Sequence, residues 1–63
     1  MKTKNVNELT KNDWKHGVYY DNHDHWGVMR VSELKGGYMY LVNEYGQTKF
    51  VPYWDDTEVE VDE

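Results

Sequence analysis

The 63-residue sequence contains no cysteine, and its single serine and its glycines lie outside any catalytic motif. Without cysteine the chain forms no disulfide, offers no thiolate nucleophile and cannot build a cysteine-ligated zinc site. Ser32 has no Gly-x-Ser-x-Gly surroundings, and Gly36-Gly37 lacks the GxxxxGK context of a phosphate-binding loop. A chain this short is also poorly suited to hold paired carboxylates in a dry pocket. We therefore expect no enzymatic activity and no cofactor.

Long hydrophobic runs are also missing. The longest apolar stretch, Tyr38 to Val42, is far shorter than the roughly 20 residues that cross a bilayer. No apolar region follows the first five residues, as it does in a signal peptide. We expect a soluble, cytoplasmic protein with no membrane partner.

Aliphatic residues are scarce, since alanine and isoleucine are absent and leucine, valine and phenylalanine make up 12 of the 63 residues. Such a content lies at the threshold below which disorder is expected. Three Trp, six Tyr and one Phe oppose that interpretation, because disordered chains are poor in aromatics. Valine and aromatic side chains fit the pleated surface of a sheet. The composition predicts one small all-β domain over residues 1–63.

Five short runs with strand-type alternation follow one another from residue 17 onward. Lys35-Gly36-Gly37 favours a tight hairpin because glycine readily adopts positive φ angles, and Glu44-Tyr45-Gly46 favours a short loop closed by a glycine bulge. Five strands joined by such turns predict an antiparallel meander. The predicted strands are Gly17–Tyr20, Trp26–Ser32, Tyr38–Asn43, Thr48–Tyr53 and Thr57–Val61.

The domain divides by composition into residues 1–16, 17–54 and 55–63. The first part is a polar N-terminal arm in which Asn5 and Glu8 imitate a capping box. It predicts either a helical turn near Asn7–Asn12 or an irregular arm. The middle part is the β-meander, and the last is an acidic C-terminal strand or tail.

The order of several short motifs along the chain indicates a known layout. Leu9 and Asp13-Trp14 precede Gly17-Val18-Tyr19, and Trp26-Gly27-Val28, the run from Gly46 to Val51, a brief turn and a last short strand follow. This layout resembles that of SH3-like small barrels. The resemblance covers most of the chain but includes no motif specific to one family. It implies that the meander curls into a small barrel, and it implies nothing about partners.

The net charge of −5 is concentrated at the C-terminus. Residues 55–63 carry six acidic and no basic side chains, whereas residues 1–54 carry seven basic and six acidic ones. In one interpretation, Val59 and Val61 face the core while Glu58 and Glu60 form the solvated face of an edge strand. In the other, the acidic residues meet a basic partner or imitate nucleic-acid phosphates. These residues are Asp55, Asp56, Glu58, Glu60, Asp62 and Glu63.

A cluster of histidine and aspartate around residue 23 resembles a metal site. Asp21, His23 and His25 would share one face of an extended segment, a spacing that suits tetrahedral zinc, and His16 could add a ligand. The composition of Asn22-His23-Asp24 is instead typical of a solvated turn. We expect no metal site.

Both faces of two predicted strands are apolar, although a small sheet ordinarily leaves one face wet. Alternation places one set of side chains on the core face and a second set either under the N-terminal arm, through Leu9 and Trp14, or on a partner surface. The core set is Met29, Val31, Met39 and Leu41, and the second set is Trp26, Val28, Arg30, Tyr38 and Tyr40. The predicted partner-binding residues are Tyr38, Tyr40, Trp26, Arg30 and Tyr19.

These features predict that the protein is a non-catalytic module that occupies a surface of a larger protein. We expect the module to be a monomer or a weak homodimer. The profile resembles that of small phage or mobile-element proteins that inhibit or redirect a host factor. One alternative is an acidic nucleic-acid mimic that binds a DNA- or RNA-handling protein. The other is single-stranded nucleic-acid binding through surface aromatics, which the scattered basic residues disfavour. Mimicry weakens steeply with salt, whereas an aromatic hot spot does not.

Overall fold

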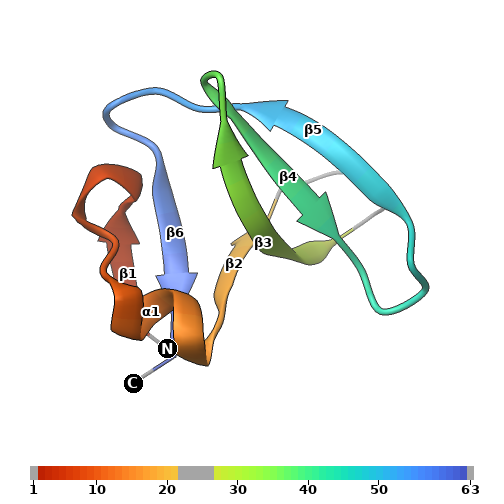
Figure 1. Cartoon of the computed structure of the whole chain (residues 1–63), viewed down its shortest axis with the longest axis horizontal. Helices are drawn as coiled ribbons and strands as arrows, with labels where there is room; N and C mark the ends of the chain where they lie inside the picture. Colours follow the sequence, from red (N-terminus) through yellow and green to blue (C-terminus); the bar gives the residue numbers. More distant parts are fainter. Residues whose placement is uncertain (1, 22–26, 63) are drawn as a thin grey trace.

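The computed structural model describes residues 2–21 and 27–62, which form one antiparallel sheet with a short helical segment at one end (Figure 1). The sheet has six strands in the order β1-β6-β2-β3-β4-β5. The predicted all-β class is confirmed, and the five predicted strands correspond to β2 through β6. The strands are β1 Lys2–Asn5, β2 Val18–Asp21, β3 Val28–Lys35, β4 Tyr38–Val42, β5 Thr48–Pro52 and β6 Glu58–Val61.

Two parts of the predicted architecture are wrong. The N-terminal arm supplies a sixth strand, because β1 pairs along its whole length with β6. The sheet also does not close into an SH3-like barrel, because its first and last strands in space, β1 and β5, do not pair with each other. β6 crosses from the end of β5 to pair with both β1 and β2. Only β2 to β5 form a meander, and β1 and β5 are the two edges. β6 is therefore an interior strand and not the edge strand that its charge predicted.

The turns of the meander form where their residues predicted them. Gly36 and Gly37 connect β3 to β4 with φ angles of 56° and 81°, which strain a residue that has a Cβ. Between β4 and β5, the Asn43 side chain accepts hydrogen bonds from the backbone N–H groups of Tyr45 and Gln47, each at 3.0 Å. Both hairpins are thus specified by local chemistry.

The core lies on one face of the sheet, called here the inner face. The predicted core face is confirmed, as is the burial of the two valines of β6. A six-residue helix is too short to cover this face, so the sheet coils around its own core, and β1 and β6 lie at a steep angle to β4 and β5 (Figure 1). The fully buried side chains are Val18, Met29, Val31, Met39, Leu41, Val59 and Val61.

The N-terminal segment covers one end of the inner face. The 3-10 turn η1 (Val6–Glu8) buries Val6, and Leu9 packs against the core together with Trp14 of helix α1 (Lys11–His16). The helix lies further along the chain than the predicted turn, because Thr10 rather than Asn5 forms the capping box, with Asp13. No helix within residues 2–21 and 27–62 has the length and apolar character to cross a membrane.

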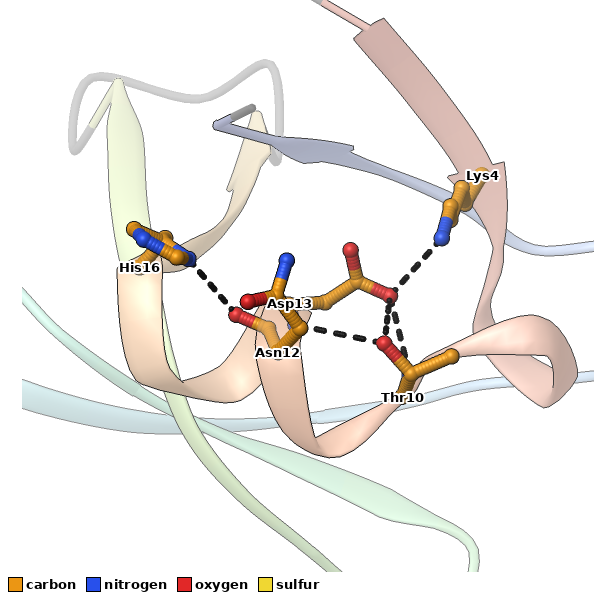
Figure 2. A network of polar contacts seen from close by, with 5 residues as sticks. All are labelled: Lys4, Thr10, Asn12, Asp13 and His16. Atoms are coloured by element: carbon orange, nitrogen blue, oxygen red, sulfur yellow. Dashed lines mark hydrogen bonds and ion pairs between the residues drawn. The ribbon is translucent and has the colours of Figure 1, made fainter.

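Asp13 is the one buried charged residue in the part of the chain that the structure describes. Its Oδ2 accepts hydrogen bonds from Lys4 Nζ at 2.9 Å, from the Thr10 backbone N–H at 2.8 Å and from the Thr10 hydroxyl at 3.0 Å (Figure 2). The bond from Lys4, followed by that from the Thr10 N–H, lowers the pKa of Asp13, although burial opposes the shift. Because Lys4 belongs to β1, this network ties α1 to the edge of the sheet.

The network makes stability depend on pH. The pKa of Asp13 is lower in the folded chain than its ordinary value of 3.8, so its contribution is present above that value and is lost as pH falls through the folded pKa. Urea titrations should therefore show stability falling more steeply between about pH 5 and pH 2 in the natural chain than in Asp13→Asn. Equal slopes in the two chains would contradict this assignment.

The inner face should account for most of the stability. Leu41 is fully buried, so Leu41→Ala should lower the free energy of unfolding by about 2–5 kcal/mol in chemical denaturation. Tyr38 lies on the same strand and is 48% exposed, so Tyr38→Ala should cost less than about 1 kcal/mol. Similar losses in both variants would show that the two faces of β4 are packed alike.

Candidate functional site

The face of the sheet opposite to the core, called here the outer face, carries a group of exposed rings. The register of β4 and β5 places Tyr40 beside Phe50 and Tyr38 beside Pro52. The rings of Tyr40 and Phe50 stack with their centroids 4.9 Å apart. Phe50 is 58% exposed. These four residues, Tyr38, Tyr40, Phe50 and Pro52, form the aromatic half of the outer face.

No segment in residues 2–21 and 27–62 covers the aromatic half. Leu9 and Trp14, which the sequence offered as a cover, pack against the core, and Trp14 also lines a hollow with Val28, Arg30 and Val42 at the end of β3 and β4 away from the rings. Helix α1 is tied to β1 by the ion pair between Lys4 and Asp13 at 2.9 Å. For the described residues, the alternation that placed Tyr38 outside and Met39 inside is confirmed, and the N-terminal arm leaves Tyr38 exposed.

Tyr19 and Arg30 lie at the centre of the outer face, directly opposite each other in the β2–β3 pair. Gly17 makes room for the tyrosine, because a Cβ at residue 17 would lie 2.7 Å from the Tyr19 hydroxyl oxygen. Arg30 is exposed and has Val42 of β4 as its other cross-strand neighbour. The structure thus brings together four of the five predicted partner-binding residues, and the fifth, Trp26, lies outside the described residues.

A β-bulge in β3 adds two charged residues that sequence reasoning missed. The register shifts between Val31 and Glu33, so Glu33 lies opposite Tyr40 and Lys35 lies opposite Tyr38, on the outer face. Strict alternation from Val31 would have placed both on the inner face, and nothing in the local sequence marks the bulge. Phe50 and Pro52 were also missed, although the alternation of Thr48–Pro52 carries a signal for them.

The other half of the outer face is acidic. Four acidic residues line an open hollow of about 520 Å³ between β1, β6 and β2, together with Thr3, Thr57 and Tyr19. Two of them come from β6, one from the end of β2 and one from the turn before β6. These residues, Asp21, Asp56, Glu58 and Glu60, form the acidic half of the outer face.

Strand register keeps the lysines of β1 away from the acidic half. Lys2 and Lys4 lie opposite Val61 and Val59, whereas Thr3 and Asn5 lie opposite Glu60 and Glu58. Because alternate residues of a strand project from opposite faces, both lysines lie on the inner side, where Lys4 reaches Asp13. The described cross-strand neighbours of the two glutamates include no basic residue.

The remaining acidic residues of the C-terminal segment do not join this surface. The backbone oxygen and the carboxylate of Asp55 accept hydrogen bonds from the side chains of Asn5 and Asn7, respectively, and so anchor the turn before β6. Asp62 lies near Lys2 and Lys4, beside α1. Glu63 lies outside the described residues. Of the six predicted acidic residues, only Asp56, Glu58 and Glu60 therefore belong to the acidic half.

Two residues of the predicted histidine and aspartate cluster, Asp21 and His16, lie within the described part of the chain. Asp21 is exposed at the end of β2, and His16 is exposed with its Nδ1 2.9 Å from the carbonyl oxygen of Asn12. His23 and His25 lie outside the described residues. Within residues 2–21 and 27–62, no group of three or more His, Cys, Asp or Glu side chains could hold a metal ion.

A lysine at residue 3 should neutralise part of the acidic half. Residue 3 lies directly opposite Glu60, so Thr3→Lys should raise the free energy of unfolding by about 0.2–1 kcal/mol at low salt. The gain should disappear in about 1 M NaCl. Thr3→Gln is the uncharged control, and equal stability of the two variants at low salt would show that residues 3 and 60 do not interact.

Comparisons with known proteins assign no family to the chain. No family model matches it, and searches among curated proteins and among solved structures found no significant match. The function is therefore inferred from the outer face itself.

Proposed function

We propose that the protein is a non-catalytic interaction module that occupies a surface of a larger protein and thereby inhibits or modulates it. The observation that carries the proposal is the aromatic half, in which Tyr38 is 48% and Phe50 58% exposed beside the Tyr40 ring. A contiguous exposed apolar patch is typical of an interaction site, and tyrosine is enriched at binding hot spots. The core is packed on the other face, so folding does not require these rings.

The rings are held in place before any partner binds. They stand on β4 and β5, and β4 is paired on both sides, with β3 and with β5. The stacking of Tyr40 on Phe50 further limits their rotation. Side chains that are already ordered lose little conformational entropy on binding, which favours their use as anchors.

The outer face supports docking better than the edges of the sheet do. β1 carries Lys2 and Lys4, and β5 carries Lys49 and Pro52. Lysine and proline in an edge strand oppose pairing with a further strand. We therefore expect the partner to lie on the outer face and not to extend the sheet.

A second candidate function is that of a nucleic-acid mimic that binds a DNA- or RNA-handling protein. It is supported by Glu58 and Glu60, whose charges the register of β1 leaves without a basic neighbour across the strands. Binding of this kind would depend on salt and would not require the aromatic half. Direct binding of single-stranded nucleic acid through the rings is disfavoured, because the acidic half repels phosphates.

Phe50→Ala tests the proposal. The side chain is exposed, so the melting temperature should change little, whereas binding to the protein captured by the natural chain in an affinity pull-down should weaken by about 2 kcal/mol or more. The captured protein is identified by mass spectrometry and its affinity is measured by calorimetry. Tyr45→Ala is the matched control, since this ring is 80% exposed but belongs to the loop between β4 and β5.

The outcome separates the two candidates. Loss of capture with Phe50→Ala alone supports the module. Unchanged capture with Phe50→Ala, together with loss in Glu58→Gln/Glu60→Gln, would favour the mimic. Equal losses with Phe50→Ala and Tyr45→Ala would contradict a binding site on the outer face.

A further inference from the structure

The aromatic and acidic halves are parts of one continuous face, and we infer that together they fit a protein surface on which lysine or arginine residues border an apolar patch. This inference rests on the proposed function and specifies the chemistry of the partner. It joins two features that the sequence left as competing explanations, the rings and the acidic segment.

Strand pairing establishes that the two halves are continuous. A row of outer-face positions crosses the whole sheet through successive cross-strand partners. Its members are Thr3, Glu60, Tyr19, Arg30, Val42 and Thr48. β6 and β4 are three strand spacings apart in this order, which corresponds to about 14 Å across the strands. Tyr40 lies two residues from Val42 along β4, which adds about 7 Å in the strand direction. One helix or one hairpin of a partner spans that distance and contacts both halves.

The distribution of charge on the outer face indicates which charge the partner surface carries. The acidic half has four carboxylates lining one hollow, whereas near the rings Glu33 and Lys35 lie on the same face of β3 and offset each other. Arg30 lies between the halves. The lysines Lys2 and Lys4 lie on the inner side of β1, so a partner that approaches the outer face meets negative charge beside exposed rings. Complementary potential favours a basic partner.

Other occupants fit this face less well. A second copy of the chain also carries a net charge of −5, and packing two outer faces together would bring like charges close. A nucleic acid would place its phosphates against the acidic half. A purely apolar partner would bury carboxylates without compensation. A basic surface with an apolar border satisfies both halves.

The test uses a synthetic amphipathic peptide of about 18 residues as the probe, with lysines on one helical face and leucines on the other. We expect it to bind the natural chain at low salt. In nuclear magnetic resonance titrations, it should shift the backbone signals of Glu60 and Tyr19 as well as those of Tyr40 and Phe50. Signals from Lys4 and from α1, on the inner side, should not move. A peptide with serine for leucine, and one with glutamate for lysine, should each bind at least about tenfold more weakly.

Three variants assign the contribution of each half. Glu58→Gln/Glu60→Gln should weaken binding of the lysine–leucine peptide about five- to tenfold and should flatten its salt dependence. Phe50→Ala should weaken it about tenfold or more and leave the salt dependence as it is. Glu8→Gln removes an exposed carboxylate of η1 that does not line the acidic hollow, and should have no effect.

Several results would overturn the inference. Shifts confined to one half, shifts on the inner side, unchanged binding in Glu58→Gln/Glu60→Gln, or binding of a labelled oligothymidine to the same face would each do so. In one outcome, Phe50→Ala abolishes capture of the cellular partner, while neither added salt nor Glu58→Gln/Glu60→Gln changes that capture. The proposed module function then stands, and the inferred basic surface of the partner is wrong. If none of these changes affects capture, both proposals fail.

Discussion

The position of β6 between β1 and β2 governs both the core and the acidic half of this fold. It buries Val59 and Val61 in the core and places Glu58 and Glu60 on the opposite face. A slip of one residue would exchange these pairs, exposing both valines and burying two carboxylates. Hydrophobic burial therefore holds the register, and the register in turn creates the acidic half. The same pairing directs Lys4 toward Asp13 and so positions α1.

The core and the proposed recognition surface lie on opposite faces of the same strands. In β4, Met39 and Leu41 are fully buried while Tyr38 is half exposed. The bulge in β3 maintains this division, because it keeps Leu34 against the core and moves Glu33 to the outer face. A chain of this size cannot cover both faces of a sheet. Its short N-terminal segment covers one end of the inner face, and Tyr38 and Phe50 on the outer face stay exposed.

Several features of the fold and the candidate site could be predicted because they depend on residues close together in the chain. The two-residue period of β3 and β4 separates the core side chains from Tyr38 and Tyr40. The hairpin at Gly36-Gly37 follows from the φ angles that only glycine adopts without strain. The helix could have been placed correctly from Thr10 and Asp13, whose spacing is that of a capping box. Phe50, in turn, is marked by the alternation of its own strand.

The fold class, the turns and the inner face can be predicted from local sequence, since each follows from a period or a backbone preference within a few residues. The pairing of β1 with β6, the open sheet and the shared face of the rings and the carboxylates depend on contacts between residues far apart in the chain. Lys2 and Val61 are opposite each other yet lie at the two ends of the chain. No local sequence pattern predicts this pairing. The alternation of polar and apolar residues in β6 is compatible with a place next to β5 as well as with a place next to β2. The pairing with β2 is favoured because it buries Val18, Val59 and Val61 in one cluster with residues of β3 and β4. This hydrophobic stabilisation is gained only when all of these strands are in place.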